Sequence, residues 1–174
     1  MTQQSVSMAQ DPNYIQLQVI SALKSKLKGG INWFYWIAGL SLLNSILYLL
    51  EADLSFIVGL GVTQLVDVIF DQAAIEAGAD MSMIGFILSF GINCVIAGLF
   101  VLAGMLGRKR HAWAVIVGMV LYSLDGILLA AMHIWLDAGF HLLALYGLFR
   151  GLQAIYQLKK LDTPAPTSAV PVLP

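Results

Sequence analysis

Charged residues are scarce in this chain of 174 residues. Asp, Glu, Lys and Arg make up 11% of it, against about 25% of a typical soluble domain. Apolar residues make up 59%, and the mean hydropathy is +0.83. A soluble chain of this length could not cover its surface with so few charges, so the composition predicts a single membrane domain.

Other absences exclude further classes of protein. The chain has one cysteine, Cys94, which excludes a disulfide scaffold. The net charge of −1 argues against a nucleic-acid partner, which a basic surface would attract. The sequence also contains no P-loop, nucleophile elbow, zinc-protease motif or dinucleotide-binding fingerprint. We therefore expect the sequence to say more about topology than about chemistry.

Four hydrophobic stretches are long enough to cross a bilayer, which takes about 20 mostly apolar residues. They are 31–50, 83–106, 112–136 and 138–158. Only Asp125 in the third and Arg150 in the fourth interrupt them with a charge. Because backbone groups in lipid must bond within their own segment, we expect four transmembrane helices in a bundle over 31–158. The predicted fold is an all-α integral membrane protein.

The segment between the first two spans, 51–82, is acidic and contains a fifth, shorter apolar stretch. Its polar residues Thr63, Asp67 and Asp71 recur at helical spacing. This pattern predicts an amphipathic or re-entrant helix in an outer loop.

The basic residues support this topology. They form three clusters, one before the first span, one between the second and third, and one after the last: Lys24, Lys26 and Lys28; Arg108, Lys109 and Arg110; Lys159 and Lys160. If the fifth stretch does not cross, all three clusters lie on one side, which the positive-inside rule assigns to the cytoplasm. If it crosses, two clusters lie outside. We therefore predict four spans with both termini cytoplasmic, in a plasma or bacterial inner membrane.

The two ends of the chain differ from the bundle in composition. Residues 1–10 are predicted to be disordered, as is the Pro-rich tail, 161–174. Between residues 1–10 and the first span, apolar residues recur every four positions: Ile15, Val19, Leu23 and Leu27. This indicates a cytoplasmic amphipathic helix over 11–28, with its lysines near anionic lipid headgroups and a corner at Gly29-Gly30. Alternatively, this helix folds against the end of the bundle.

Asp125 and Arg150 are the two charges within predicted spans. They lie equally far along the chain from an expected turn at Asp137 and Ala138, roughly 18 Å from it at 1.5 Å per residue. An antiparallel hairpin therefore predicts a buried ion pair, in a polar cluster with the side chains that flank it at helical spacing: Tyr122, Tyr146 and Gln153. Such a pair either fixes helix register or serves as a proton or ion relay.

The same hairpin brings His133, Asp137 and His141 close to its turn. Two imidazoles and a carboxylate are ligands that zinc and other transition metals accept. A metal site is one interpretation, and histidines bonded to water or headgroups are the other. No other cofactor is predicted.

Small residues mark two faces for close helix packing. They are Gly85, Ser89, Asn93 and Ala97 in the second span, and Gly147 and Gly151 in the fourth. The helices they face belong to the same bundle, to a second copy or to another membrane protein.

Three functions remain open from the sequence. The favoured one is a non-enzymatic accessory or scaffold protein that associates with membrane partners or lipids. The first alternative is translocation of a proton, an ion or a small solute through the Asp125–Arg150 cluster. The second is a membrane enzyme with a metal at His133, Asp137 and His141 on the outer face.

Overall fold

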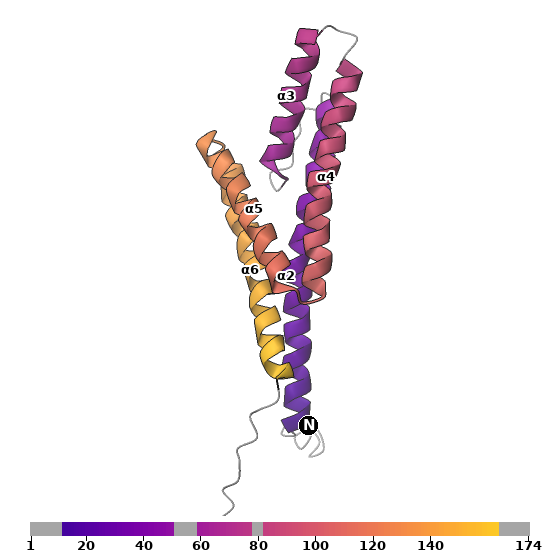
Figure 1. Cartoon of the computed structure of the whole chain (residues 1–174). Helices are drawn as coiled ribbons and strands as arrows, with labels where there is room; N and C mark the ends of the chain where they lie inside the picture. Colours follow the sequence, from indigo (N-terminus) through magenta and orange to yellow (C-terminus); the bar gives the residue numbers. More distant parts are fainter. Residues whose placement is uncertain (1–11, 51–58, 78–81, 164–174) are drawn as a thin grey trace, which may run out of the picture.

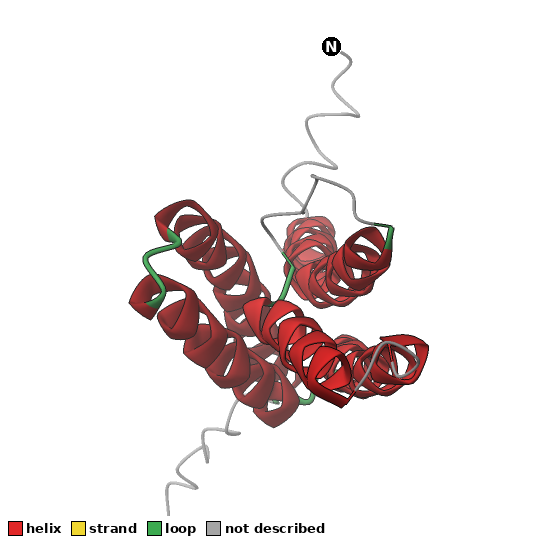
Figure 2. Cartoon of the chain, turned by 90° about the horizontal axis from the view of Figure 1, so that it is seen from above, coloured by secondary structure: helices red, strands yellow, loops and turns green. Residues whose placement is uncertain are grey.

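The computed structural model describes residues 12–50, 59–77 and 82–163, and all its regular structure is helical (Figures 1 and 2). The five helices are α2 (Pro12–Leu49), α3 (Gly61–Ala77), α4 (Ser82–Arg108), α5 (Ala112–Ala131) and α6 (Trp135–Asp162). The predictions for 1–10, for the tail from residue 164 and for parts of the 51–82 segment lie outside the described residues.

The first helix differs from the prediction for residues 11–50. The expected amphipathic helix over 11–28 and the expected first span over 31–50 form one continuous helix, α2, of 38 residues. No corner forms at Gly29-Gly30, because α6 packs against this point. A Cβ atom on Gly30 would lie 2.5 Å from the Cα of Gly151. The missing side chains therefore allow two backbones to approach closely, and the helix continues through them.

The hairpin of α5 and α6 also differs from its prediction. Its turn occupies residues 132–134, well before the expected turn at Asp137 and Ala138. His133 adopts a left-handed backbone with a φ of 63°. The N–H of His133 donates to the carbonyl of Ala130, and that of Ile134 to the carbonyl of Leu129, both at 3.0 Å. These bonds close the end of α5 in the manner usual for a glycine. The last helix then extends past 158, its predicted end, to Asp162.

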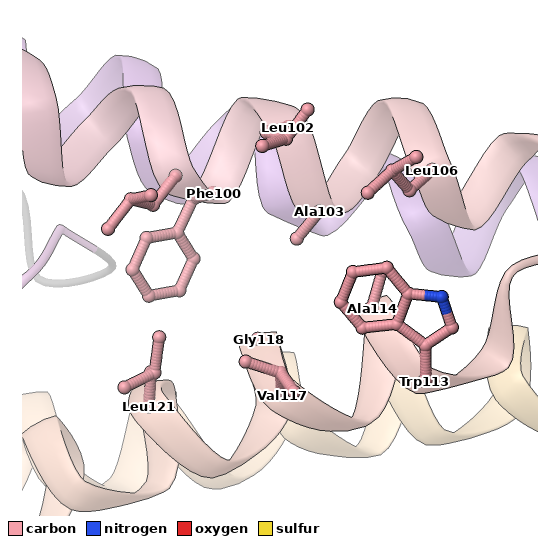
Figure 3. A pocket seen from close by; sticks show the side chains of 10 residues that line it. Phe100, Leu102, Ala103, Leu106, Trp113, Ala114, Val117, Gly118 and Leu121 are labelled. Carbon is pink, nitrogen blue, oxygen red and sulfur yellow. The ribbon is translucent and has the colours of Figure 1, made fainter.

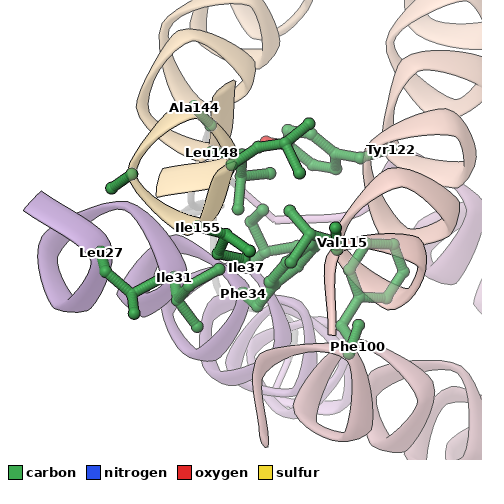
Figure 4. Close-up of a cluster of buried hydrophobic side chains, with 14 of the residues drawn as sticks. Leu27, Ile31, Phe34, Ile37, Phe100, Val115, Tyr122, Ala144, Leu148 and Ile155 are labelled. Carbon is green, nitrogen blue, oxygen red and sulfur yellow. The ribbon is translucent and has the colours of Figure 1, made fainter. Parts of the chain in front are cut away.

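Four helices share an apolar core. Side chains from α2, α4, α5 and α6 fill it, among them Ile31, Phe34, Phe100, Val115, Leu148 and Ile155 (Figure 4). The outward faces are apolar too, since Val95, Ile127 and Leu142 are each more than 60% exposed. Two helical segments, Met83–Arg108 and Ala112–Ala131, are long and apolar enough to cross a membrane.

The short helix α3 begins inside the bundle. It packs against α2 and α4 at the end remote from the start of α2 (Figure 1). Leu60, Gly61 and Thr63 at its start are buried. Gly59 lies against α2 well before the end of that helix, because a Cβ there would be 2.6 Å from Nδ2 of Asn44. We call this half of the bundle the α3 end, and the opposite half, which contains the Arg108–Arg110 turn, the basic end.

Candidate buried polar site

The carboxylate of Asp125 holds the start of α3. The N–H of Gly61 donates to Oδ2 of Asp125 at 2.9 Å, and the N–H of Val62 donates to Oδ1 at 2.7 Å. The first N–H groups of a helix have no acceptor within that helix and carry its partial positive charge. Asp125 is 6% exposed, so a buried carboxyl group from α5 satisfies the buried N-terminus of α3.

His141 of α6 binds the same carboxylate. Its Nε2 lies 2.9 Å from Oδ2 of Asp125, and its Nδ1 lies 2.8 Å from the backbone oxygen of Asp137. A carbonyl oxygen can only accept, so Nδ1 carries a hydrogen. A hydrogen bond between Nε2 and the carboxyl then requires a second proton, on the imidazole or on Asp125. A carboxylate beside a neutral imidazole would lack this second proton. The buried Asp125–His141 pair therefore holds one proton more than those two groups.

Tyr122 fixes the imidazole from one side. The two rings are stacked, with centroids 4.1 Å apart and an interplanar angle of 17°. Tyr122 is 0% exposed and His141 1% exposed. The ring therefore cannot turn away from Asp125 without breaking this stack.

The structure corrects the predicted partner of Asp125. Arg150 is exposed on the outer face of α6, with its guanidinium 5.9 Å from the ring centre of Tyr146. Tyr146 and Gln153 are exposed as well, so only Tyr122 and Asp125 of the predicted cluster are buried. The cause is the position of the turn, because its centre at His133 is equally far from Asp125 and His141.

The structure does not assemble the predicted metal ligands. His133 is exposed and lies edge-on to Trp135, with ring centroids 5.9 Å apart. His141 points to Asp125, and Asp137 contributes its backbone oxygen to that imidazole. Within residues 12–50, 59–77 and 82–163, no three His, Cys, Asp or Glu side chains are grouped to hold a metal ion.

A second polar cluster lies where α2, α3 and α4 meet. Asn93 of α4 uses Nδ2 to donate to Asp67 Oδ1 at 2.7 Å, to Ser45 Oγ at 2.8 Å and to the backbone oxygen of Thr63 at 3.2 Å. Asn93 is 0% and Asp67 3% exposed. Two atoms of this cluster, Oδ2 of Asp67 and Oδ1 of Asn93, are buried and have no hydrogen-bond partner.

Burial governs the ionisation of Asp67. Desolvation raises its pKa above the ordinary value for an aspartate, while hydrogen bonds from Ser45, Ser89 and Asn93 act in the opposite direction. Burial disfavours the charged form because the interior solvates a carboxylate less well than water does.

Polar contacts connect α3 to its neighbours along its length. The N–H of Leu60 donates to Ser41 Oγ at 2.7 Å, and Thr63 Oγ1 donates to the backbone oxygen of Leu60 at 2.7 Å. Farther along, the hydroxyl of Tyr48 donates to Asp71 at 3.3 Å. These groups extend from Asp125 in the interior to Asp71 near the end of the bundle.

The small-residue faces lie at helix contacts. Gly85, Ser89, Asn93 and Ala97 are all buried on α4. A Cβ on Gly85 would lie 3.0 Å from the backbone oxygen of Phe70, so this face meets α3. On α6, Gly151 faces Gly30, and Gly147 faces the indole of Trp33.

Sequence reasoning did not anticipate two of these contacts, His141 with Asp125 and Asp67 with Asn93. The polar spacing on α3 and the polar face of the second span were both visible. Nothing in the sequence showed that these two faces meet.

An apolar groove lies between α4 and α5. It has a volume of about 280 Å³, and its lining includes Phe100, Ala103, Leu106, Trp113 and Leu121 (Figure 3). Apart from the indole nitrogen of Trp113, its side chains offer no polar group that would orient a substrate. The chemistry of the described residues therefore lies in the two buried polar clusters. Comparison of the chain with protein-family models, with curated proteins and with solved structures gave no match.

Proposed function

We propose that the chain is an integral membrane protein with four spans, α2, α4, α5 and α6, and that α3 is a re-entrant helix. The apolar outward faces and the buried polar start of α3 support this topology. The basic end would lie in the cytoplasm. Arg150 joins the other basic residues there, because its neighbour Gly151 packs on Gly30, next to the lysines of α2.

We propose further that the protein moves protons across this membrane through Asp125 and His141. The observation that carries this proposal is the pair of contacts made by the His141 ring, Nδ1 with the backbone oxygen of Asp137 and Nε2 with Asp125. From these contacts we infer an extra proton between the two buried groups. Buried ionisable residues in membrane helices commonly serve as proton relays. The earlier translocation hypothesis is thus kept, with His141 in place of Arg150.

The surroundings of the pair suggest a direction of access. On the α3 side, polar groups extend from Asp125 to Asp71, among them Ser41, Thr63 and Asp67. On the basic side, the described core is filled by apolar side chains such as Phe34, Phe100 and Val115, which offer a proton no polar group. Protons would therefore reach the pair from the outer side, and their release inward would require α5 and α6 to move apart from α2 and α4.

Proton flux into liposomes tests this function. Purified full-length protein is reconstituted into vesicles that contain a pH-sensitive dye, and a potassium diffusion potential is applied. We expect internal acidification that Asp125→Asn and His141→Gln abolish. Arg150→Gln is the matched control, since it removes a charge from the same hairpin at an exposed site, and it should leave the flux intact. Equal flux in all four proteins, or in empty vesicles, would contradict the proposal.

An accessory role is a second candidate, which one observation favours. Tyr14, Ile15 and Leu17 at the start of α2 are between 44% and 66% exposed, and they lie beyond the proposed membrane. Together with Lys24, Lys26 and Lys28, they present an apolar and basic surface to anionic headgroups or a membrane partner. Binding of residues 12–28 to anionic vesicles, lost when Ile15 and Leu17 are replaced by serine, would support this role. Absence of proton flux with intact vesicle binding would make it the preferred one.

A further inference from the structure

The Asp67–Asn93 cluster contains two buried oxygens that require a positive partner. Oδ2 of Asp67 and Oδ1 of Asn93 can only accept when the carboxyl is ionised, and neither has a donor. The two side chains are already joined by one hydrogen bond of 2.7 Å, so their free oxygens belong to one small region. Leaving buried acceptors and a buried charge unpaired is costly, and native structures seldom do so.

No cationic side chain supplies this positive charge in the described residues. Apart from each other, the hydrogen-bond partners of Asn93 and Asp67 are the neutral groups of Ser45, Thr63 and Ser89. The nearest titratable groups toward the end of the bundle are Tyr48 on α2 and Asp71 on α3, which bind each other. Toward the interior, Asp125 of α5 and His141 of α6 bind each other at the start of α3. On the facing stretch of α4, the neighbours Ser89 and Asn93 are uncharged.

We propose that Asp67 and Asn93, together with the hydroxyl of Ser45, form a binding site for one monovalent cation, which is either a proton or a sodium ion. The ligands are all oxygens, the type that hard cations prefer. One carboxylate supplies one negative charge, which a single positive charge balances. A proton on Oδ2 and a sodium ion between the two oxygens satisfy the same pair of atoms, so they compete. This site is separate from Asp125–His141 and does not depend on the proposed function.

Thermal unfolding of the full chain in detergent tests the site. The melting temperature Tm is measured at low and high pH, in choline chloride and in sodium chloride of equal concentration. The pKa of Asp67 is raised in the folded protein, so its contribution to stability is present at low pH and is lost as the pH rises through that pKa. We expect Tm to fall with pH in choline chloride. If sodium binds, it should restore about 3 °C at high pH.

Asp67→Asn separates this site from the other titrating groups. Its amide can donate to Oδ1 of Asn93, so the variant should fold with both oxygens satisfied. We expect it to lose both the sodium response and most of the fall in Tm with pH. Asp71→Asn removes a carboxylate one turn away on the same helix and should keep both responses. Asn93→Asp adds a second carboxylate and should enlarge the response to sodium or to low pH.

The sodium and pH measurements together distinguish the two cations. A sodium response that Asp67→Asn abolishes identifies sodium, whereas a pH response alone that Asp67→Asn abolishes identifies a proton. A pH response that persists in Asp67→Asn belongs to other groups of the protein and overturns the proposal. A wild-type Tm that neither sodium nor pH changes also overturns it.

Discussion

The two ends of the bundle are held together by different forces. At the basic end, α2, α4, α5 and α6 pack through apolar side chains and glycines, as where Gly30 faces Gly151 and Gly118 faces Phe34. At the α3 end, buried hydrogen bonds hold α3 to its neighbours, from Asp125 to Asn93. Close packing of complementary side chains stabilises helix contacts in water and in lipid alike. Buried polar contacts are stable only while every partner is present and correctly protonated.

We therefore expect the buried contacts of the α3 end to respond to protonation and the buried apolar contacts of the basic end not to respond, although the surface of the basic end carries the Arg110–Asp162 ion pair. A change of one proton alters the hydrogen bonds at Asp125–His141 or at Asp67–Asn93 but leaves the contacts among Phe34, Phe100 and Val115 unchanged. The proposed proton movement would need both kinds of region, a polar element that changes and a frame against which it moves. The predictions below test whether the two ends respond as differently as their contacts suggest.

The largest effect is expected at Asp125. Replacement by asparagine puts an amide nitrogen opposite a backbone N–H of α3 in either orientation, that of Gly61 or that of Val62, so we expect a loss of about 3 kcal/mol in unfolding free energy. Chemical denaturation in detergent measures the loss, and hydrogen exchange should rise in α3 while the start of α5 stays protected. Exchange that rises equally in both helices would show that the two ends are not distinct.

A double-mutant cycle identifies the partner of Asp125. Asp125→Asn and His141→Gln should couple by more than about 1 kcal/mol, because both remove one interaction. Asp125→Asn and Arg150→Gln should be additive, since Arg150 is exposed on the other side of α6. Coupling to Arg150 would restore the hairpin register that the sequence alone suggested.

The basic end should respond to volume instead. Gly30→Ala would place a methyl group 2.5 Å from the Cα of Gly151, and we expect it to cost about 2 kcal/mol through the displacement of α6. Its neighbour offers a matched control, because a Cβ on Gly29 meets nothing within 4 Å. Gly29→Ala should stabilise the helix by about 0.5–1 kcal/mol. If both variants lost stability in denaturation, the residues would form the corner that the sequence suggested, and α2 would not be continuous.

A smaller effect is expected where α2 meets the start of α3. Ser41→Ala leaves the buried N–H of Leu60 without its acceptor and should cost about 1.5 kcal/mol. Ser123→Ala is the control, since that hydroxyl donates only to the carbonyl of Met119 one turn earlier on its own helix. It should change the unfolding free energy by less than about 0.5 kcal/mol. Equal losses would mean that the contact between Ser41 and Leu60 adds no stability.

The sequence predicted more of the helices than of their contacts. Hydrophobic length located α4 and the start of α5 closely, and polar spacing located α3, because both signals arise from residues near one another in the chain. The sequence predicts a corner at Gly29-Gly30, since glycines commonly end helices, whereas in the structure Gly30 admits the backbone of α6 at Gly151. Whether a glycine bends a helix or packs against one depends on a partner that lies far away in the sequence.

The site depended on a single turn. The sequence predicts the α5–α6 turn at Asp137 and Ala138, between the hydrophobic stretches 112–136 and 138–158. The actual turn at 132–134 contains no glycine or proline, the residues that usually mark turns. With the turn at 132–134, the residue opposite Asp125 is His141 and not Arg150. A shift of a few residues in the predicted turn therefore gives a different predicted site.

The smallest predicted effect, a gain in unfolding free energy, is expected at the same turn. His133 has a φ of 63°, a conformation that costs a residue with a side chain about 1 kcal/mol and glycine little. Because glycine is also more flexible in the unfolded chain, His133→Gly should raise the unfolding free energy by only about 0.5 kcal/mol. His133→Ala keeps the strained backbone and should give no gain. A loss with both variants would mean that the imidazole itself is needed, as a metal ligand or otherwise. A gain with glycine alone would show that the backbone sets this turn, and with it the pairing of Asp125 with His141 that distinguishes the α3 end from the basic end.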